Sequence, residues 1–218
     1  MSKSGTESSK TKNRRAENFA AAVAALRRGK PIVFPTETLY GLGADALNVA
    51  AVEKIFQLKG RDSNNPIPVL VADNTMLRAL VAEVSPRAEQ LMASFWPGPL
   101  TLVLPARKDL PRPLLNSTGG IAVRISSQPI ATALVKALGR PLTATSANPS
   151  GKIPARTVEQ ATKYFAGQIE IFVDGGELTS KIGSTVAEIS GDTLKIIRSG
   201  EIGKTQLQRV VGNGKVLA

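Results

Sequence analysis

The order of apolar and polar residues divides the chain into short helices and strands. Apolar side chains recur at helical spacing in the run AENFAAAVAALRR (16–28), and Gly29 would end that helix. Asn48 is placed to cap a second helix that ends at Gly60. Further helices are predicted over 74–81, from Pro86 to about Ser94 behind a Ser85 cap, over 130–138, from a Thr157–Gln160 capping box to Phe165, and near the C-terminus.

Short apolar runs between these helices predict strands. They are PIVF (31–34), the run that starts at Pro66, PLTLVLPA (99–106), GIAVRIS (120–126), the run that starts at Pro141, IEIFV (169–173), STVAEI (184–189) and TLKIIR (193–198). The last two flank Gly191-Asp192, which favours a hairpin turn. The segment PTETLYGLG is predicted to be a loop. We therefore expect an α+β fold with one mixed sheet flanked by helices.

The domain organisation follows from length and from the polar start of the chain. A length of 218 residues suits one compact domain. Residues 1–15 are predicted to form a flexible basic tail, and residues 16–218 the folded domain. No apolar run approaches the ~20 residues of a membrane span, and no apolar signal core is visible at the start. We expect a cytoplasmic protein that does not act at a membrane.

Charge and missing residue types restrict the chemistry. Lys and Arg number 28 against 17 acidic residues, a formal charge of +11 that favours a polyanionic ligand. The chain has no Cys and no His, which excludes disulfides, Cys or His catalysis and the common zinc sites. No protein-held metal is predicted. Positioning and charge neutralisation, as in nucleotidyl transfer, suit the remaining residue types.

Two polar segments follow apolar elements early in the chain. PTETLYGLG places Thr36 and Tyr40 after a buried strand, either as an ordinary turn or as a ligand loop. Lys59 and Arg61 lie at a helix C-terminus, where cations either stabilise the helix dipole or bind an anion together with Ser63. The spacing of a Walker A loop is absent.

Three further features lie in the second half of the chain. The hydroxyls and amide of TATSANPSG include Ser146 and Asn148, although turn chemistry alone explains its Asn-Pro-Ser-Gly part. Ser184 and Arg198 lie beside predicted strands. Strand alternation places Arg124 on one face with Ala122 and Ser126. A half-buried Arg124 needs an anionic partner, either a protein carboxylate or a ligand.

The motifs taken together resemble a known family. PTETLYGLG, KGR followed by NNP, SFWPGPLTLVL, GIAVRI, TSANPSG, GSTV and IIRSG occur in this order, as in the YrdC-like threonylcarbamoyl-AMP synthases of the short form. The resemblance runs from about Phe19 to Gly203. Asp62 stands where a Pro is common, and the His found in some members is absent. The resemblance implies a YrdC/RibB-like single domain with a twisted parallel and antiparallel sheet and a concave basic face.

The resemblance also implies a reaction and roles for residues. L-threonine, bicarbonate and ATP would give threonylcarbamoyl-AMP and pyrophosphate, a nucleotidyltransferase reaction that supplies the donor for threonylcarbamoyladenosine in tRNA. Mg²⁺ would arrive on the ATP phosphates, and downstream threonylcarbamoyl-transferase proteins would use the product. The implied threonine-binding residues are Thr36, Tyr40, Arg124 and Ser184. The implied nucleotide-binding residues are Lys59, Arg61, Ser63, Ser146, Asn148 and Arg198, with Lys59 and Arg61 as the catalytic pair.

Two alternatives stay open at the level of sequence. A basic surface could bind tRNA or another RNA without catalysis, although an aromatic content of 4% is low for a protein that stacks bases. A silent paralogue of the same family is the other alternative. ATP turnover separates both alternatives from the synthase.

Overall fold

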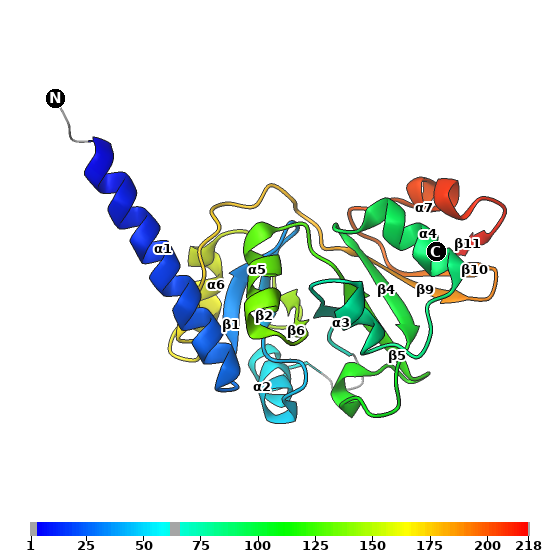
Figure 1. Cartoon of the computed structure of the whole chain (residues 1–218), viewed down its shortest axis with the longest axis horizontal. Helices are drawn as coiled ribbons and strands as arrows, with labels where there is room; N and C mark the ends of the chain where they lie inside the picture. Colours follow the sequence, from blue (N-terminus) through cyan, green and yellow to red (C-terminus); the bar gives the residue numbers. More distant parts are fainter. Residues whose placement is uncertain (1–3, 62–65, 218) are drawn as a thin grey trace.

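The computed structural model describes the backbone of residues 4–61 and 66–217, and the side chains from residue 16 onward within those ranges. Two sheets and the helices packed on them form the fold (Figure 1). The helices are α1 (Ser4–Arg27), α2 (Val49–Lys59), α3 (Asn74–Arg78), α4 (Pro86–Phe95), the short 3-10 turn η1 (Arg112–Leu114), α5 (Pro129–Leu138), α6 (Val158–Phe165) and α7 (Lys204–Val211).

The first sheet has the strand order β7-β2-β1-β8. Its strands are β1 (Ile32–Pro35), β2 (Tyr40–Gly43), β7 (Thr145–Ser146) and β8 (Ile171–Phe172). Strand β1 pairs antiparallel with β2 and parallel with β8. Helices α1 and α5 pack together on this sheet through a core cluster that includes Leu26, Phe34 and Leu134 (Figure 1).

The second sheet has the strand order β11-β10-β9-β4-β5-β3-β6. Its strands are β3 (Val69–Leu70), β4 (Leu100–Pro105), β5 (Gly120–Arg124), β6 (Leu142–Thr143), β9 (Thr185–Ser190), β10 (Thr193–Arg198) and β11 (Lys215–Leu217). Helices α4 and α7 pack together on it, and Leu91, Leu194 and Leu207 share the larger hydrophobic core (Figure 1).

The local signals for helix ends are confirmed at most positions. The Asn48 side chain accepts a hydrogen bond from Ala51 N–H, and Gly60 ends α2 in the left-handed conformation with φ 56°. Ser85 caps α4 with Pro86 at its first position. Thr157 caps α6, but the Gln160 side chain accepts from Arg156 N–H, so the reciprocal half of the predicted capping box is made one residue earlier.

Three predictions about the elements need correction, and one strand was missed. Two mixed sheets replace the single predicted sheet, because the chain passes from β6 to β7 at Ala144 and thereby changes sheets. The predicted loop PTETLYGLG contains β2, whose Gly41 and Gly43 pair with β1. Strand β11 was not predicted. Helix α1 begins at Ser4 rather than at Ala16, and no proline interrupts this polar stretch; a polar pattern alone does not distinguish an exposed helix from a tail. The flexibility of residues 1–15 stays a prediction.

The two sheets meet at Thr143. Its hydroxyl accepts a hydrogen bond from Ala44 N–H at 2.8 Å, and its own N–H donates to Ala44 O at 2.9 Å. Thr143 belongs to the second sheet, and Ala44 directly follows strand β2 of the first. This junction sets how the polar ends of the strands face one another. In the described part of the chain, no helix is both long enough and apolar enough to cross a lipid bilayer.

Candidate functional site

A cleft of about 580 Å³ is lined by residues from both sheets. Strand β2 and the turn before it contribute Thr36, Thr38 and Tyr40, and strand β7 contributes Thr145 and Ser146. Strands β4, β5, β9 and β10 of the second sheet supply the floor. Among the described lining residues, the charged ones are all arginines, namely Arg61, Arg124 and Arg198. The volume suits a small-molecule ligand, and the charge favours an anionic one.

Strand alternation divides this floor into a polar and an apolar end. Thr101 and Val103 both point into the cleft from β4, and Ala122 and Arg124 do so from β5. Val103 pairs with Ala122 across the two strands, and both contact Val186 of β9 in a small cluster separate from the main cores. The shared face of Ala122 and Arg124 confirms the predicted alternation for these two residues, whereas Ser126 lies beyond the end of β5 and does not line the cleft.

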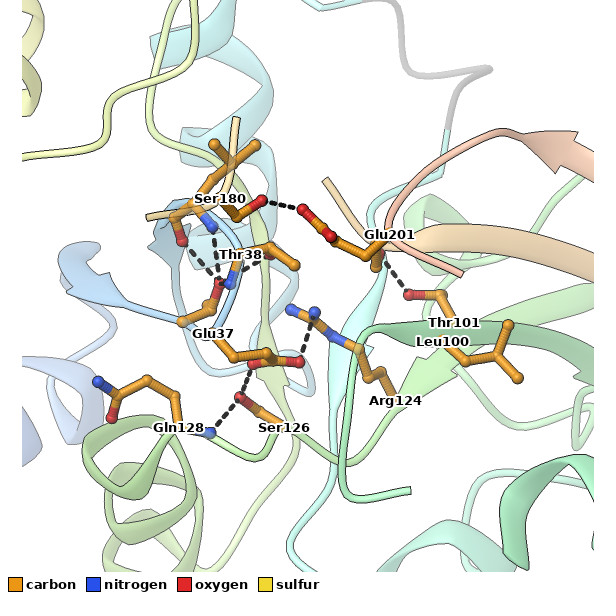
Figure 2. Close-up of polar contacts among 12 residues, drawn as sticks. Glu37, Thr38, Leu100, Thr101, Arg124, Ser126, Gln128, Ser180 and Glu201 are labelled. Carbon is orange, nitrogen blue, oxygen red and sulfur yellow. Dashed lines mark hydrogen bonds and ion pairs between the residues drawn. The ribbon is translucent and has the colours of Figure 1, made fainter. Parts of the chain in front are cut away.

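Arg124 has a protein carboxylate as its partner, one of the two alternatives left open by the sequence. Its Nη1 donates to Glu37 Oε1 at 2.9 Å, and the Ser126 hydroxyl donates to Glu37 Oε2 (Figure 2). Arg124 is 5% exposed. Burial lowers the pKa of Arg124, and the charge of Glu37 acts in the opposite direction. The guanidinium nevertheless lines the cleft, so it can also face a ligand.

Ser184 and Arg198 lie together at the polar end of the floor. The Arg198 Nη2 donates to Ser184 O at 2.8 Å and to Ser184 Oγ at 3.1 Å. The Ser184 hydroxyl also lies 2.8 Å from the hydroxyl of Thr101. Partial burial, together with the positive charges of Arg124 and Arg61, lowers the pKa of Arg198. Arg124 and Arg61 thus both repel Arg198, and a bound anion would offset this repulsion.

The hydroxyls of Thr36 and Tyr40 are used largely within the protein. Thr36 Oγ1 donates to Leu39 O at 2.6 Å and holds the turn that leads into β2. Tyr40 OH lies 2.8 Å from Gly176 O and accepts from Gly175 N–H at 2.9 Å. Burial raises the pKa of Tyr40 to about 12. Both residues line the cleft, and their hydrogen bonds shape its wall.

Lys59 lies beside the main cleft rather than in it. It is 4% exposed, and with Arg61, Ser146 and Asn148 it lines an adjoining pocket of about 390 Å³. Its ammonium group donates to Ser146 O at 2.6 Å and to Asn148 O at 2.7 Å. Burial, and secondarily the charge of Arg61, lowers the pKa of Lys59 to about 8.

Arg61, Ser146 and Asn148 occupy different positions around this pocket. Arg61 and Ser146 line both the pocket and the main cleft. Burial lowers the pKa of Arg61, and its Nη2 donates to Pro66 O at 3.3 Å. Asn148 is 5% exposed, and its amide donates to Pro149 O and Lys152 O, so it holds its own turn. The predicted site residue Ser63 lies outside the described residues.

The structure adds three residues that were not predicted for the site: Thr101, which lines the cleft, and Glu37 and Ser126, which do not line it but contact Arg124 or its partner. Glu37 and Ser126 support Arg124, and Thr101 contacts Ser184. Thr101 is a polar residue within an apolar strand, and Glu37 is an acid close to the end of the buried β1 strand. These features could have identified both as candidate site residues from the sequence. Among the described residues, no group of three or more His, Cys, Asp or Glu could hold a metal ion.

Comparison with known proteins places the chain in a family. A family model described as telomere recombination, covering Sua5, YciO and YrdC proteins, matches residues 24–200. The threonylcarbamoyl-AMP synthases of Bacillus subtilis and Thiobacillus denitrificans are 41% and 40% identical, over 89% and 81% of this chain. The chain spans 92% of the T. denitrificans protein but 56% of the B. subtilis protein.

A solved structure supports the same family assignment. The crystal structure of Pyrococcus abyssi Sua5 complexed with L-threonine superposes with a TM-score of 0.87 at 38% identity, and it covers 93% of this chain and 59% of that one. The chain thus spans less than two thirds of the P. abyssi and B. subtilis proteins. The matched family model extends over most of the described fold, from within α1 to just beyond β10. The chain therefore belongs to the Sua5/YciO/YrdC family.

Proposed function

We propose that this chain makes threonylcarbamoyl-AMP and pyrophosphate from L-threonine, bicarbonate and ATP. The observation that carries the proposal is the cleft between the sheets, whose charged lining residues among those described are three arginines surrounded by hydroxyls. A reaction between anions needs this combination of positive charge and positioned donors. Relatives at about the same level of identity are named threonylcarbamoyl-AMP synthases, and P. abyssi Sua5 binds L-threonine in its crystal structure.

The threonine would bind at the polar end of the cleft floor. Arg124 would pair with the amino-acid carboxylate, and Ser184 would close the pocket opposite the wall that Thr36 and Tyr40 form. These four residues all line the cleft. The hydrogen bonds that Thr36 and Tyr40 make within the protein argue that they shape the pocket rather than change partners during the reaction.

The nucleotide phosphates would bind near the junction of the cleft and the smaller pocket. Arg61 and Arg198 would contact the phosphates, and Ser146 would orient the nucleotide. The same role for Ser63 stays a prediction from the sequence. Lys59 and Asn148 would act mainly by holding the backbone of residues 146–152. The Lys59 ammonium group donates to Ser146 O and Asn148 O, and the Asn148 amide donates to Pro149 O and Lys152 O. Lys59 would also add positive charge at short range. Mg²⁺ would enter bound to the ATP phosphates as part of the substrate.

The reaction requires that two anions, a carboxylate formed from threonine and ATP, are held with the attacking oxygen in line with the α-phosphorus. The neutral amine of threonine forms an N–C bond with the carbon of bicarbonate, a C–O bond breaks, and water leaves to give N-carboxy-threonine. Its carboxylate oxygen then attacks the α-phosphorus of ATP while the bond to pyrophosphate breaks. The arginines neutralise the charge on the leaving group. This makes the chain a nucleotidyltransferase. Its product would be the donor used by a downstream transferase for tRNA modification, which fits a cytoplasmic location.

The test is pyrophosphate release by the purified chain with ATP, Mg²⁺ and bicarbonate, with and without L-threonine. We expect release that depends on both threonine and bicarbonate. An Arg61→Gln variant serves as the inactive control, and Arg107→Gln, an exposed change outside the cleft, serves as the neutral control. Folded protein that releases no pyrophosphate, or releases it without threonine, would refute the proposal.

A further inference from the structure

The Glu37 side chain connects the two sheets that form the cleft. It belongs to the turn that follows strand β1 of the first sheet, whereas Arg124 ends strand β5 of the second. Glu37 Oε1 accepts from Arg124 Nη1 at 2.9 Å, and the two side chains are 14% and 6% exposed. Glu37 does not appear among the residues that line the cleft, although Arg124 does. The carboxylate is therefore placed to influence a ligand through Arg124.

A chain of hydrogen bonds fixes this carboxylate in turn. Gln128 N–H donates to Ser126 Oγ at 3.2 Å, and the Ser126 hydroxyl donates to the second carboxylate oxygen of Glu37 (Figure 2). Both oxygens of Glu37 are therefore occupied, one by a hydroxyl and one by a guanidinium. A carboxylate that is hydrogen-bonded at both oxygens keeps one orientation. It thereby also fixes the orientation of the side chain with which it pairs.

Arg124 depends on this support because a second guanidinium, that of Arg198, lies within electrostatic range of it. The positive charges of Arg124 and Arg61 both lower the pKa of Arg198, so Arg124 and Arg198 repel each other. A buried guanidinium without a counter-charge is strongly destabilised. Within the described part of the chain, Arg124 forms its ion pair with Glu37. Loss of that carboxylate would let Arg124 turn or withdraw from the cleft floor.

We infer that Glu37 is a positioning residue that fixes Arg124 for the carboxylate of the amino-acid substrate and thereby sets the affinity for that substrate. The inference rests on the proposed function, in which Arg124 pairs with the threonine carboxylate. Glu37 does not line the cleft, so its effect on the substrate would pass through Arg124. Its contribution is separable from that of the phosphate-binding residues, because Arg61 and Lys59 contact the backbone of other segments.

The test is a Glu37→Gln variant, which keeps the shape and removes the charge. We expect the KM for L-threonine to rise about 10-fold or more while the KM for ATP stays within about twofold, since small misplacements of a positioning group are costly. General disruption of the cleft would instead raise both values. The wild-type KM for each substrate is measured in the same pyrophosphate assay.

Asp45→Asn is the matched control. Asp45 is 5% exposed at its side chain and pairs at 3.0 Å with Arg140, which is 59% exposed. The variant therefore removes a buried carboxylate from an ion pair with nearly the same N–O distance. Asp45 does not line the cleft. We expect this variant to lose stability and to keep both KM values.

Two milder variants keep the inference testable if Glu37→Gln does not fold. Ser126→Ala removes the hydroxyl donor to Glu37, and Glu37→Asp keeps the charge on a shorter side chain. Both should raise the threonine KM by less than Glu37→Gln does, without changing the ATP KM. An unchanged threonine KM in these variants, or equal increases in both KM values, would overturn the role of Glu37. Wild-type protein without threonine-dependent turnover would instead overturn the proposed function.

Discussion

The ammonium group of Lys59, at the end of α2, donates a hydrogen bond of 2.7 Å to the backbone carbonyl of Asn148. A second bond of 2.6 Å reaches Ser146 O, and Ser150 N–H returns a bond to Lys59 O at 2.8 Å. The end of one helix and a polar turn from the other half of the chain are thus connected at three points. Residues 146–150 owe their position beside Arg61 to this connection.

Replacement of Lys59 by Met should therefore strongly reduce catalysis. Two buried carbonyls would lose their donor, and the phosphate site would lose a charge, at a cost of roughly 2.7–4 kcal/mol in the transition state, or about 10²–10³ in rate. The measurement is kcat/KM for ATP in the pyrophosphate assay. Lys54→Met, on an exposed position of the same helix, should stay within about twofold of wild type. A wild-type rate for Lys59→Met would exclude this role.

The pH dependence should show the titration of the same group. Because the pKa of Lys59 is lowered to about 8, the charge is lost as pH rises through about 8, and the kcat/KM for ATP should fall there. The contribution of Lys59 titration to the unfolding free energy changes with pH in the opposite direction. Between about pH 8 and the ordinary value of 10.5, the unfolded chain keeps a proton that the folded chain has released, so this contribution rises with pH.

Urea unfolding of wild type and Lys59→Met across pH 7 to 10 separates the two effects. The unfolding free energy of wild type minus that of Lys59→Met should increase with rising pH, while the activity of wild type declines. A flat difference together with a flat activity profile would show that Lys59 does not titrate in this range.

Replacement of Tyr40 by Phe should destabilise the fold. The hydroxyl contacts Gly175 N–H and Gly176 O, and its loss leaves both without this partner, at a cost of about 1–3 kcal/mol. The comparison is Tyr164→Phe, whose hydroxyl makes one exposed bond of 3.0 Å to Ile153 O and should cost less. Urea midpoints measure both. Equal midpoints for the two variants would contradict the buried role of Tyr40.

Replacement of Gly43 by Ala should disturb the contact between strand β2 and its neighbours. An added Cβ would lie 2.5 Å from Phe34 Cε1 and 2.6 Å from Thr143 O, so a ring and a backbone would both have to move. We expect a loss of about 1–3 kcal/mol in unfolding free energy. Gly203→Ala is the control, because the nearest atom to its added Cβ is Gln206 Oε1 at 3.6 Å. The prediction fails if both variants unfold at the same urea concentration.

Much of the local structure could be predicted from the chain alone. Asn48 and Gly60 define α2, Ser85 and Pro86 start α4, and Gly191 with φ 54° turns β9 into β10. These signals work because a cap or a tight turn depends on side chains within about four residues of it. The order of the polar motifs likewise predicted the family to which the chain belongs.

The candidate site was also predictable only in part from the sequence. The sequence identified Arg61, Arg124, Ser184 and Arg198 as candidates because cations and hydroxyls beside apolar strands are conspicuous, and all four line the cleft. It offered two possible partners for Arg124 and no means to choose, since Glu37 is separated from it by 87 positions. It also placed Lys59 on the phosphates, without the two carbonyls that its ammonium group contacts.

The sequence by itself thus determined where most helices and strands begin, which residues could carry charge into a site, and the family. Only the tertiary structure decided that the strands form two sheets, that Glu37 supports Arg124, and that Lys59 holds residues 146–150. The physical reason is distance along the chain. Local signals depend on neighbouring residues, whereas these pairings depend on where backbones far apart in the sequence approach each other once the core is packed.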